Sequence, residues 1–208
     1  MKKTSPHLIR SGKQLAALAA SARQEIIDVL EQMGGVVSVA ELAAALGRPA
    51  DGLYFHLRAL MRAGLIQNAG YSSRGGRKGA IYRTIAPELQ LQYEPENPGN
   101  RKAVSAIVAS MLRLAMRDFS RSFQPGNVSV SGACRELWAL RKVGRLSRTQ
   151  LRAVNRGINR LVEQVTVPSD AHGRLYAVTV VLTPLYHRNK EPRQPRPKNS
   201  ASTERNRP

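Results

Sequence analysis

Apolar positions recur at helical spacing through the first third of the chain. In residues 13–20, a short alanine-rich stretch, Leu15 and Leu18 fall on one side. Residues 22–33 carry a continuous apolar stripe, and Gly34 with Gly35 ends it. The pattern predicts two helices here, and Ser21 is placed to cap the second.

A third and a fourth helix are predicted on either side of a Gly-Arg-Pro turn. Ser38 followed by Glu41 has the spacing of a capping box at the start of the third helix. Gly47 ends that helix, and Pro49 suits the entry to the fourth, residues 50–63. The inner face of the third helix is predicted to consist of Leu42, Ala45 and Leu46.

The fourth helix has one apolar and one polar side. Its inner side is formed by leucines spaced four and three apart, and Gly64 then ends the helix so that a strand can begin at Leu65. The leucines are Leu53, Leu57 and Leu60, and the opposite side carries Tyr54, Phe55, Arg58 and Arg62.

Two β-like runs follow directly, residues 65–69 and 80–85. Between them lies the glycine-rich and arginine-rich sequence Tyr-Ser-Ser-Arg-Gly-Gly-Arg-Lys-Gly. Two short helices followed by a basic hairpin is the order of a winged helix-turn-helix, which places one helix in the DNA major groove and a basic loop beside it. This order of elements predicts DNA binding.

The remainder of the chain has weaker patterns. A long helix is predicted over residues 101–119, a short strand near 128–130, helices over 133–140 and 148–165, and a strand over 175–182. The predicted fold is α+β, mostly helical with a little sheet. Its predicted parts are a flexible N-terminus (1–12), a winged helix-turn-helix domain (13–86), a linker (87–100), a dimerisation domain that could also hold an effector (101–187) and a disordered basic tail (188–208).

Charge narrows the class of partner. The 208 residues carry a formal net charge of +19, and the excess extends over the whole length rather than the tail alone. Such a chain is expected to bind a polyanion. No apolar run approaches the ~18 residues of a membrane span, and the basic N-terminus lacks the apolar stretch of a signal peptide, so nucleic acid in the cytoplasm is the better interpretation.

No catalytic constellation is present in the sequence. The four histidines show no metal-ligand spacing with carboxylates, and there is no nucleophile motif, so neither an enzyme nor a bound metal or cofactor is expected. With a single cysteine, Cys134, the chain forms no intramolecular disulfide. A small core residue is the favoured role of Cys134, and a redox-active thiol is the alternative. An effector pocket in the C-terminal half would draw on Phe119, Phe123, Trp138 and Tyr176, although packing in a core is the favoured role of each.

The segment His-Leu-Arg-Ala-Leu-Met-Arg-Ala-Gly-Leu-Ile, residues 56–66, resembles the ArsR-type winged helix-turn-helix transcription regulators. The preceding Val-Ala-Glu-Leu-Ala-Ala-Ala-Leu-Gly-Arg-Pro and the following basic wing belong to the same resemblance, which covers residues 15–86. It implies a homodimeric bacterial repressor or activator on a palindromic operator. Metal-sensing members carry a cysteine pair in the helix before the recognition helix. The matching segment here, residues 39–46, has none, which argues against metal sensing there.

Exposure then assigns roles within the predicted interface. Arg58 is expected either to read a guanine edge or to clamp a phosphate, and His56 either to pack with a hydrogen bond or to contact phosphate. The predicted DNA-binding residues are Asp51, Gly52, Tyr54, Phe55, Arg58 and Arg62 on the fourth helix, and Arg74, Arg77 and Lys78 on the wing.

The sequence therefore predicts a repressor that binds double-stranded DNA as a homodimer through its first helix and helix 101–119. The sequence does not decide whether a small-molecule effector binds, and no membrane partner is expected. The rival interpretations are a sequence-tolerant nucleoid or RNA-binding protein, which the charge of +19 would suit, and a module that docks protein.

Overall fold

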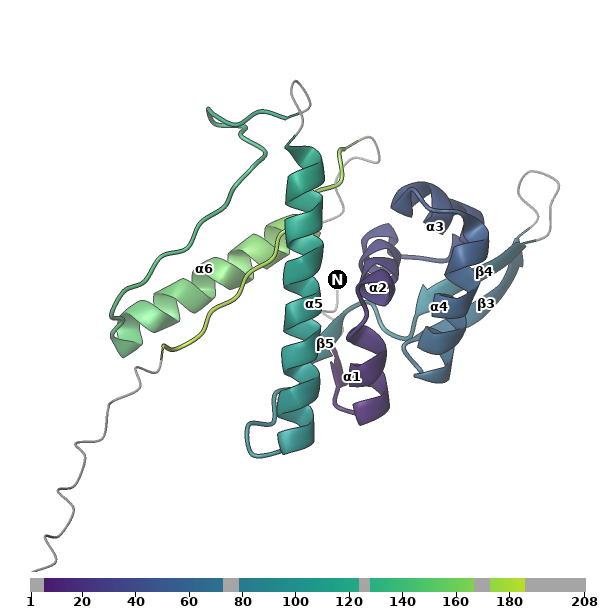
Figure 1. The fold of residues 1–208 in the computed structure, drawn as a ribbon, viewed down its shortest axis with the longest axis horizontal. Coiled ribbons are helices and arrows are strands. Elements are labelled where there is room, and N and C mark those ends of the chain that lie inside the picture. Colours follow the sequence, from purple (N-terminus) through teal and green to yellow (C-terminus); the bar gives the residue numbers. More distant parts are fainter. Residues whose placement is uncertain (1–5, 73–78, 124–127, 167–172, 186–208) are drawn as a thin grey trace, which may run out of the picture.

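The computed structural model of the protein describes residues 6–72, 79–123, 128–166 and 173–185. Helices and two small sheets make up an α+β fold, as predicted (Figure 1). In chain order the elements are β1 (His7–Ile9), α1 (Gly12–Leu18), α2 (Ser21–Met33), β2 (Val37–Ser38), α3 (Val39–Leu46), α4 (Ala50–Arg62), β3 (Ile66–Ser72), β4 (Gly79–Thr84), β5 (Leu89–Leu91), α5 (Pro98–Ser122) and α6 (Arg148–Thr166).

One hydrophobic core joins the four N-terminal helices, the β2–β4–β3 sheet and the first half of α5. Val104 and Ile107 of α5 belong to the same buried cluster as the leucines of α4. In Figure 1, α5 stands alongside α1 and α2. The Gln24 amide fixes this packing, because its Nε2 donates to the carbonyl oxygens of Leu18 at 2.7 Å and Ile107 at 3.2 Å. The first half of α5 therefore packs as part of the N-terminal unit rather than of a separate domain.

The expectation of a loosely packed N-terminus and an irregular linker was wrong where the two segments meet. Residues 7–9 form β1 and residues 89–91 form β5, and the two pair in parallel with His7 opposite Leu89. Ile9 is fully buried as a result. Three-residue strands carry no readable periodicity, and their partner lies 82 positions away, so only the tertiary structure reveals the pairing.

Two local assignments also differ from expectation. Ala20, not Ser21, is the N-cap of α2, and the Ser21 hydroxyl lies 2.8 Å from that of the buried Ser110 on α5. Ala45 is exposed, and Ala43 packs against the core in its place. The reason is that α3 begins at Val39, so its inner stripe follows the i, i+3, i+4, i+7 positions from there.

The C-terminal part departs furthest from expectation. Helix α6 forms close to its predicted bounds, but the described residues around it, including 128–130, 133–140 and 175–182, contain neither a helix nor a paired strand. In Figure 1 the two extended segments run along α6, which lies apart from the core. Cys134 is exposed here and is not a core residue. Among the described residues, no helix has the length and apolarity needed to cross a membrane.

Candidate nucleic-acid interface

Local features define both ends of α3 and the entry to α4. At the start of α3 the backbone N–H of Glu41 donates to Ser38 Oγ at 3.2 Å, and Ser38 N–H donates to Glu41 Oε2 at 2.8 Å, which confirms the capping box. At its end Gly47 adopts φ 60°, a left-handed conformation that glycine reaches without strain. Pro49 then caps α4. These local features set the angle at which α4 leaves the turn.

Helix α4 has a buried and an exposed face, as predicted. Leu53, Leu57 and Leu60 are fully buried. Phe55, with 59% of its surface exposed, and Tyr54, with 41%, point away from the core. A large aromatic ring in water is unfavourable unless something covers it, so this face has the character of a contact surface. The exposed residues of α4 include all six candidates: Asp51, Gly52, Tyr54, Phe55, Arg58 and Arg62.

The strands beside α4 form a three-stranded sheet in the order β2–β4–β3. β3 and β4 are antiparallel, with Ile66 opposite Thr84 and Ser72 opposite Gly79. A bulge between Asn68 and Gly70 interrupts the register, and Gly70 N–H donates to Asn68 Oδ1 at 2.7 Å. The bulge redirects the outer end of β3. The wing residues Arg74, Arg77 and Lys78 lie outside the described residues.

Three tyrosines and an arginine gather where α4 meets the wing strands. Burial raises the pKa of the Tyr82 hydroxyl, with smaller contributions from Tyr54 and Tyr71, while Arg58 acts in the opposite direction. Tyr71 is 65% exposed on β3. Phenolic hydroxyls and a guanidinium are all donors to phosphate oxygens. No sequence pattern marks Tyr71 as an interface residue, because this tyrosine lies at the edge of the hairpin, where alternation defines no face.

The Glu25 carboxylate of α2 ties the helix-turn-helix to α5. Arg48, in the turn before α4, donates from Nη2 to Glu25 Oε2 at 2.5 Å. Arg117 of α5 donates to the other oxygen of the same carboxylate and also to Asp118 Oδ1, the latter at 2.7 Å. The Arg48 guanidinium therefore forms an ion pair within the protein, and this ion pair fixes the position of Arg48 in the turn.

His56 lies on the flank of α4, half-buried, and its ring is at 76° to that of Phe55 with the centroids 5.4 Å apart. Burial lowers the pKa of His56, and the nearby guanidinium groups of Arg23 and Arg48 lower it further. A neutral ring is a weak phosphate ligand, which favours the packed role over the phosphate contact. The expected hydrogen bond is absent at Nδ1, which is buried without a partner among the described residues.

The aromatic residues expected to line an effector pocket do not enclose one within the described part of the chain. Phe119 and Phe123 stack on each other with ring centroids 6.0 Å apart, and Arg135 lies over the exposed Trp138 ring at 3.9 Å. Tyr176 donates to Glu136 Oε1 at 2.5 Å. The favoured core role was therefore wrong for these four aromatics, all of which are exposed.

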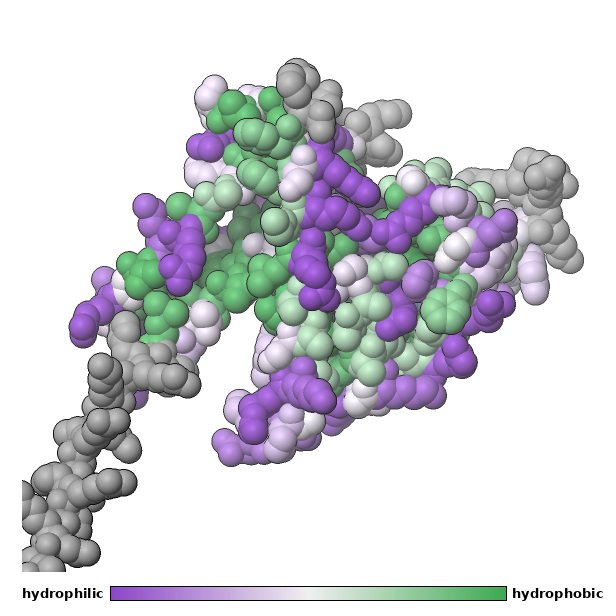
Figure 2. All heavy atoms as spheres, viewed as in Figure 1, coloured by the Kyte–Doolittle hydropathy of each residue, from purple (hydrophilic) through white to green (hydrophobic). Residues whose placement is uncertain are grey.

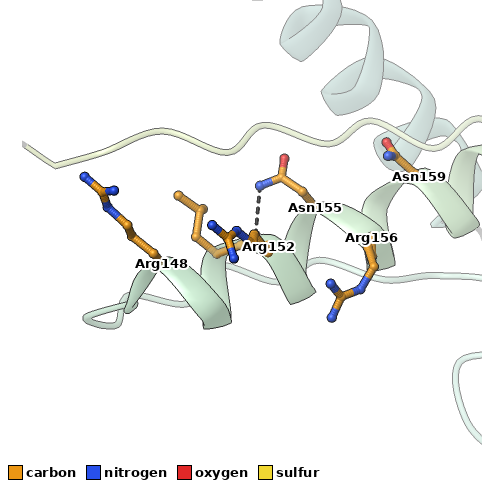
Figure 3. A pocket seen from close by; sticks show the side chains of 6 residues that line it. Arg148, Arg152, Asn155, Arg156 and Asn159 are labelled. Atoms are coloured by element: carbon orange, nitrogen blue, oxygen red, sulfur yellow. Dashed lines mark hydrogen bonds between the residues drawn. The ribbon is translucent and has the colours of Figure 1, made fainter.

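A shallow hollow of about 470 Å³ lies on α6 instead (Figure 3). Arginine and asparagine side chains dominate its lining, and the Asn155 amide folds back to donate to the Leu151 carbonyl oxygen at 2.8 Å. Among the described residues, no group of three or more histidine, cysteine, aspartate and glutamate side chains could hold a metal ion.

Comparison with known proteins bears on this region of the chain. Residues 18–67 match the model of a family described as a helix-turn-helix domain, and this range runs from the end of α1 to the start of β3. The matched range contains α2, α3 and α4, which follow one another in the order of a helix-turn-helix. The strands that follow make the helix-turn-helix domain a winged one. The match names no ArsR subgroup, so that resemblance remains a prediction.

Two further comparisons add little to this assignment. The curated proteins give no significant match. Among solved structures the chain is similar to a mutant of S. aureus MepR bound to an oligodeoxyribonucleotide, at 14% sequence identity and a TM-score of 0.26, over 70% of this chain and 78% of that chain. So loose a likeness carries no argument, and the assignment rests on the helix-turn-helix domain and its geometry.

Proposed function

We propose that the protein is a transcription regulator that binds double-stranded DNA in a sequence-specific manner. The observation that carries the proposal is the outer face of α4, where Tyr54, Phe55 and Arg58 are exposed on the second helix of a helix-turn-helix domain. In this motif the second helix enters the major groove and its side chains meet base edges. Asp51 and Gly52 lie at its N-terminal end, which approaches the bases first, and Arg62 lies at the other end.

The wing supplies the second part of the proposed interface. Arg74, Arg77 and Lys78 connect β3 to β4, the strands that lie beside α4, and contact phosphates or the minor groove. Tyr71, near the end of β3, donates a hydrogen bond to the phosphate backbone of the same DNA. The overall charge of +19 provides the sequence-independent attraction that brings the protein to DNA.

The finer proposal is an ArsR-like repressor that acts as a homodimer on a palindromic operator in the bacterial cytoplasm. A two-fold dimer presents two recognition helices about 34 Å apart, one turn of B-DNA, and a palindromic operator matches that symmetry. Blocking a promoter needs nothing beyond occupancy, which makes repression the simplest outcome. A second candidate function, sequence-tolerant binding to the nucleoid or to RNA, is favoured by the high positive charge alone.

The experiment compares binding of the full chain to the DNA upstream of its own gene with binding to a random duplex of equal length, at two salt concentrations. We expect the upstream DNA to bind more tightly, with a difference that persists at the higher salt because base contacts do not depend on counterion release. Equal affinity for both duplexes at both concentrations would favour the sequence-tolerant function instead.

Arg58→Ala tests the recognition helix directly. Its side chain is exposed, so the substitution should leave stability unchanged and weaken operator binding by about 1–3 kcal/mol. Arg113→Ala is the matched control, because it removes the same charge from an exposed position on α5, away from the proposed interface. Unchanged binding in Arg58→Ala, or an equal loss in both variants, would show that α4 is not the recognition element.

A further inference from the structure

The C-terminal arm, defined as residues 128–166 and 173–185, exposes an unusual amount of apolar surface. Its helix α6 carries apolar side chains at alternating intervals of three and four residues, the spacing of a seam that packs against another apolar element. Four arginines line the opposite side of the helix. The seam consists of Leu151, Val154, Ile158, Leu161 and Val165, and the arginines are Arg148, Arg152, Arg156 and Arg160.

The segment 175–182 has the composition of a covered strand but has no strand partner among the described residues. Its sequence, Leu-Tyr-Ala-Val-Thr-Val-Val-Leu, is β-branched and apolar on both faces, as in a strand covered on two sides. It runs extended beside α6, yet it joins no ladder with any described residue. A strand edge with unpaired N–H and C=O groups is a template for another strand.

The exposed apolar area matches what a stable interface needs. Seventeen large apolar side chains of the arm are each 36–70% exposed. Full burial of one aliphatic side chain removes roughly 60–120 Å² from water, so seventeen half-exposed ones present on the order of 500–1,000 Å². A standard interface buries ~800 Å² on each partner, and soluble monomers rarely expose more than a few hundred Å² in one patch. In Figure 2, hydrophobic atoms lie exposed on the visible face of the arm, with hydrophilic atoms among them.

The rest of the described chain does not cover this surface. Helix α6 has no extensive contact with any other described helix or strand. The apolar residues of α1, Leu15 and Leu18, are buried within the chain, as their inward spacing predicted. On α5, by contrast, the apolar side chains Leu112 and Met116 are 49% and 74% exposed.

We propose that the arm is the docking surface for a second copy of this chain. The two α6 seams pack on each other, and the two segments 175–182 pair as antiparallel strands about the two-fold axis. A second copy fits both features at once, because an uncharged seam meets an identical uncharged seam and an open strand edge meets its own antiparallel equivalent. The arginine side of α6 stays outside, away from its like-charged counterpart. The inference rests on the proposed homodimer and deepens it by naming the surface that forms it.

Sedimentation equilibrium of the full chain, without DNA, tests the seam. We expect a dimer at micromolar concentration, and we expect V154E combined with L161E to raise its dissociation constant at least 100-fold, because two charges per chain enter the seam. The matched control is N159E, which places the same residue type on the polar side of α6 and should leave the constant within about threefold. A monomeric wild-type chain, or a dimer that V154E with L161E leaves intact, overturns the proposal.

Hydrogen exchange on the unmodified chain tests the strand pairing independently of any substitution. The amides of residues 175–182 should be protected at concentrations where the dimer forms and should lose that protection on dilution. Fast exchange of these amides in the dimer would refute strand pairing and with it the proposal. Operator binding is measured separately. A dimer that fails to bind DNA contradicts the proposed function but leaves the arm interface intact. A monomer that binds DNA contradicts the arm interface but leaves DNA binding intact.

Discussion

Glu31 makes the stability of the folded protein depend on pH. This residue lies near the end of α2, half-buried, and its Oε1 accepts a hydrogen bond from the backbone N–H of Leu89 at 2.9 Å, where β5 begins. Burial raises the pKa of the Glu31 carboxyl from 4.5 to about 7. The hydrogen bond from Leu89 opposes this shift, and the charges of Asp28 and Glu88 add to it. The folded protein therefore holds a proton at Glu31 that the unfolded chain releases.

The sign of the effect follows from this difference in proton binding. Between pH 4.5 and about 7 the folded state binds more protons at Glu31 than the unfolded state does, so the free energy of unfolding decreases as pH rises through that window. At ~1.4 kcal/mol per pKa unit the shift gives an upper bound of about 3 kcal/mol. Because Glu31 is only half-buried, solvent screening reduces the expected loss to about 1–2 kcal/mol.

Glu31→Gln isolates this contribution. The glutamine amide oxygen still accepts from Leu89 N–H but carries no charge, so the variant should match the wild type near pH 5 and exceed its stability above pH 7 by about 1–2 kcal/mol. The assay is denaturant unfolding at fixed protein concentration from pH 4.5 to 8. The control is Glu96→Gln, which removes an exposed carboxylate between β5 and α5 and should leave the stability profile unchanged. A Glu31→Gln profile parallel to that of the wild type would refute the reasoning.

Two further predictions concern the interface. Leu57→Ala opens a cavity under α4 and should cost about 2–5 kcal/mol of stability in thermal or denaturant unfolding. Phe55→Ala removes an exposed side chain, so it should cost under ~1 kcal/mol of stability and yet weaken DNA binding. Equal stability losses in the two variants would contradict a helix with one buried and one exposed face. Replacing Arg74, Arg77 and Lys78 together by alanine removes up to six proposed phosphate contacts per dimer, so the slope of log K against log salt should flatten by several units, near ~0.9 per contact. A slope that stays at the wild-type value would place the wing off the DNA.

The helix-turn-helix domain was predictable because its signals are local. Ser38 and Glu41 cap α3 from three residues apart, and Gly47 and Gly64 adopt the left-handed backbone conformation that ends a helix. Leu57 and its neighbours repeat at the period of one helix face. Each of these features acts over a single turn, so the sequence alone places the helices, and the outward direction of residues such as Arg58 follows from geometry.

The contacts that the sequence did not reveal all join distant parts of the chain. The hydroxyl pair of Ser21 and Ser110 spans 89 positions, and the pairing of β1 with β5 joins His7 to Leu89. Neither interaction leaves a periodic trace in the sequence. The strand predicted over residues 175–182 failed for another reason: its β-branched composition describes a covered strand, and nothing in the described part of the chain covers it.

Glu25 links the helix-turn-helix domain, whose signals are local, to the distant helix α5. Its carboxylate, mostly buried, takes Arg48 at the entry to α4 and Arg117 on α5, so the recognition helix and α5 are fixed to the same point of α2. The shared carboxylate therefore couples the position of Arg48, at the entry to α4, to that of Arg117 on α5. Helix α5 has 25 residues, and at ~1.5 Å per residue it is about 37 Å long, close to the ~34 Å of one DNA turn. Pairing of two arms would therefore join two copies of a unit in which α5 and the recognition helix share one anchor, whereas the connection from α5 to α6 includes residues 128–147, which contain no helix.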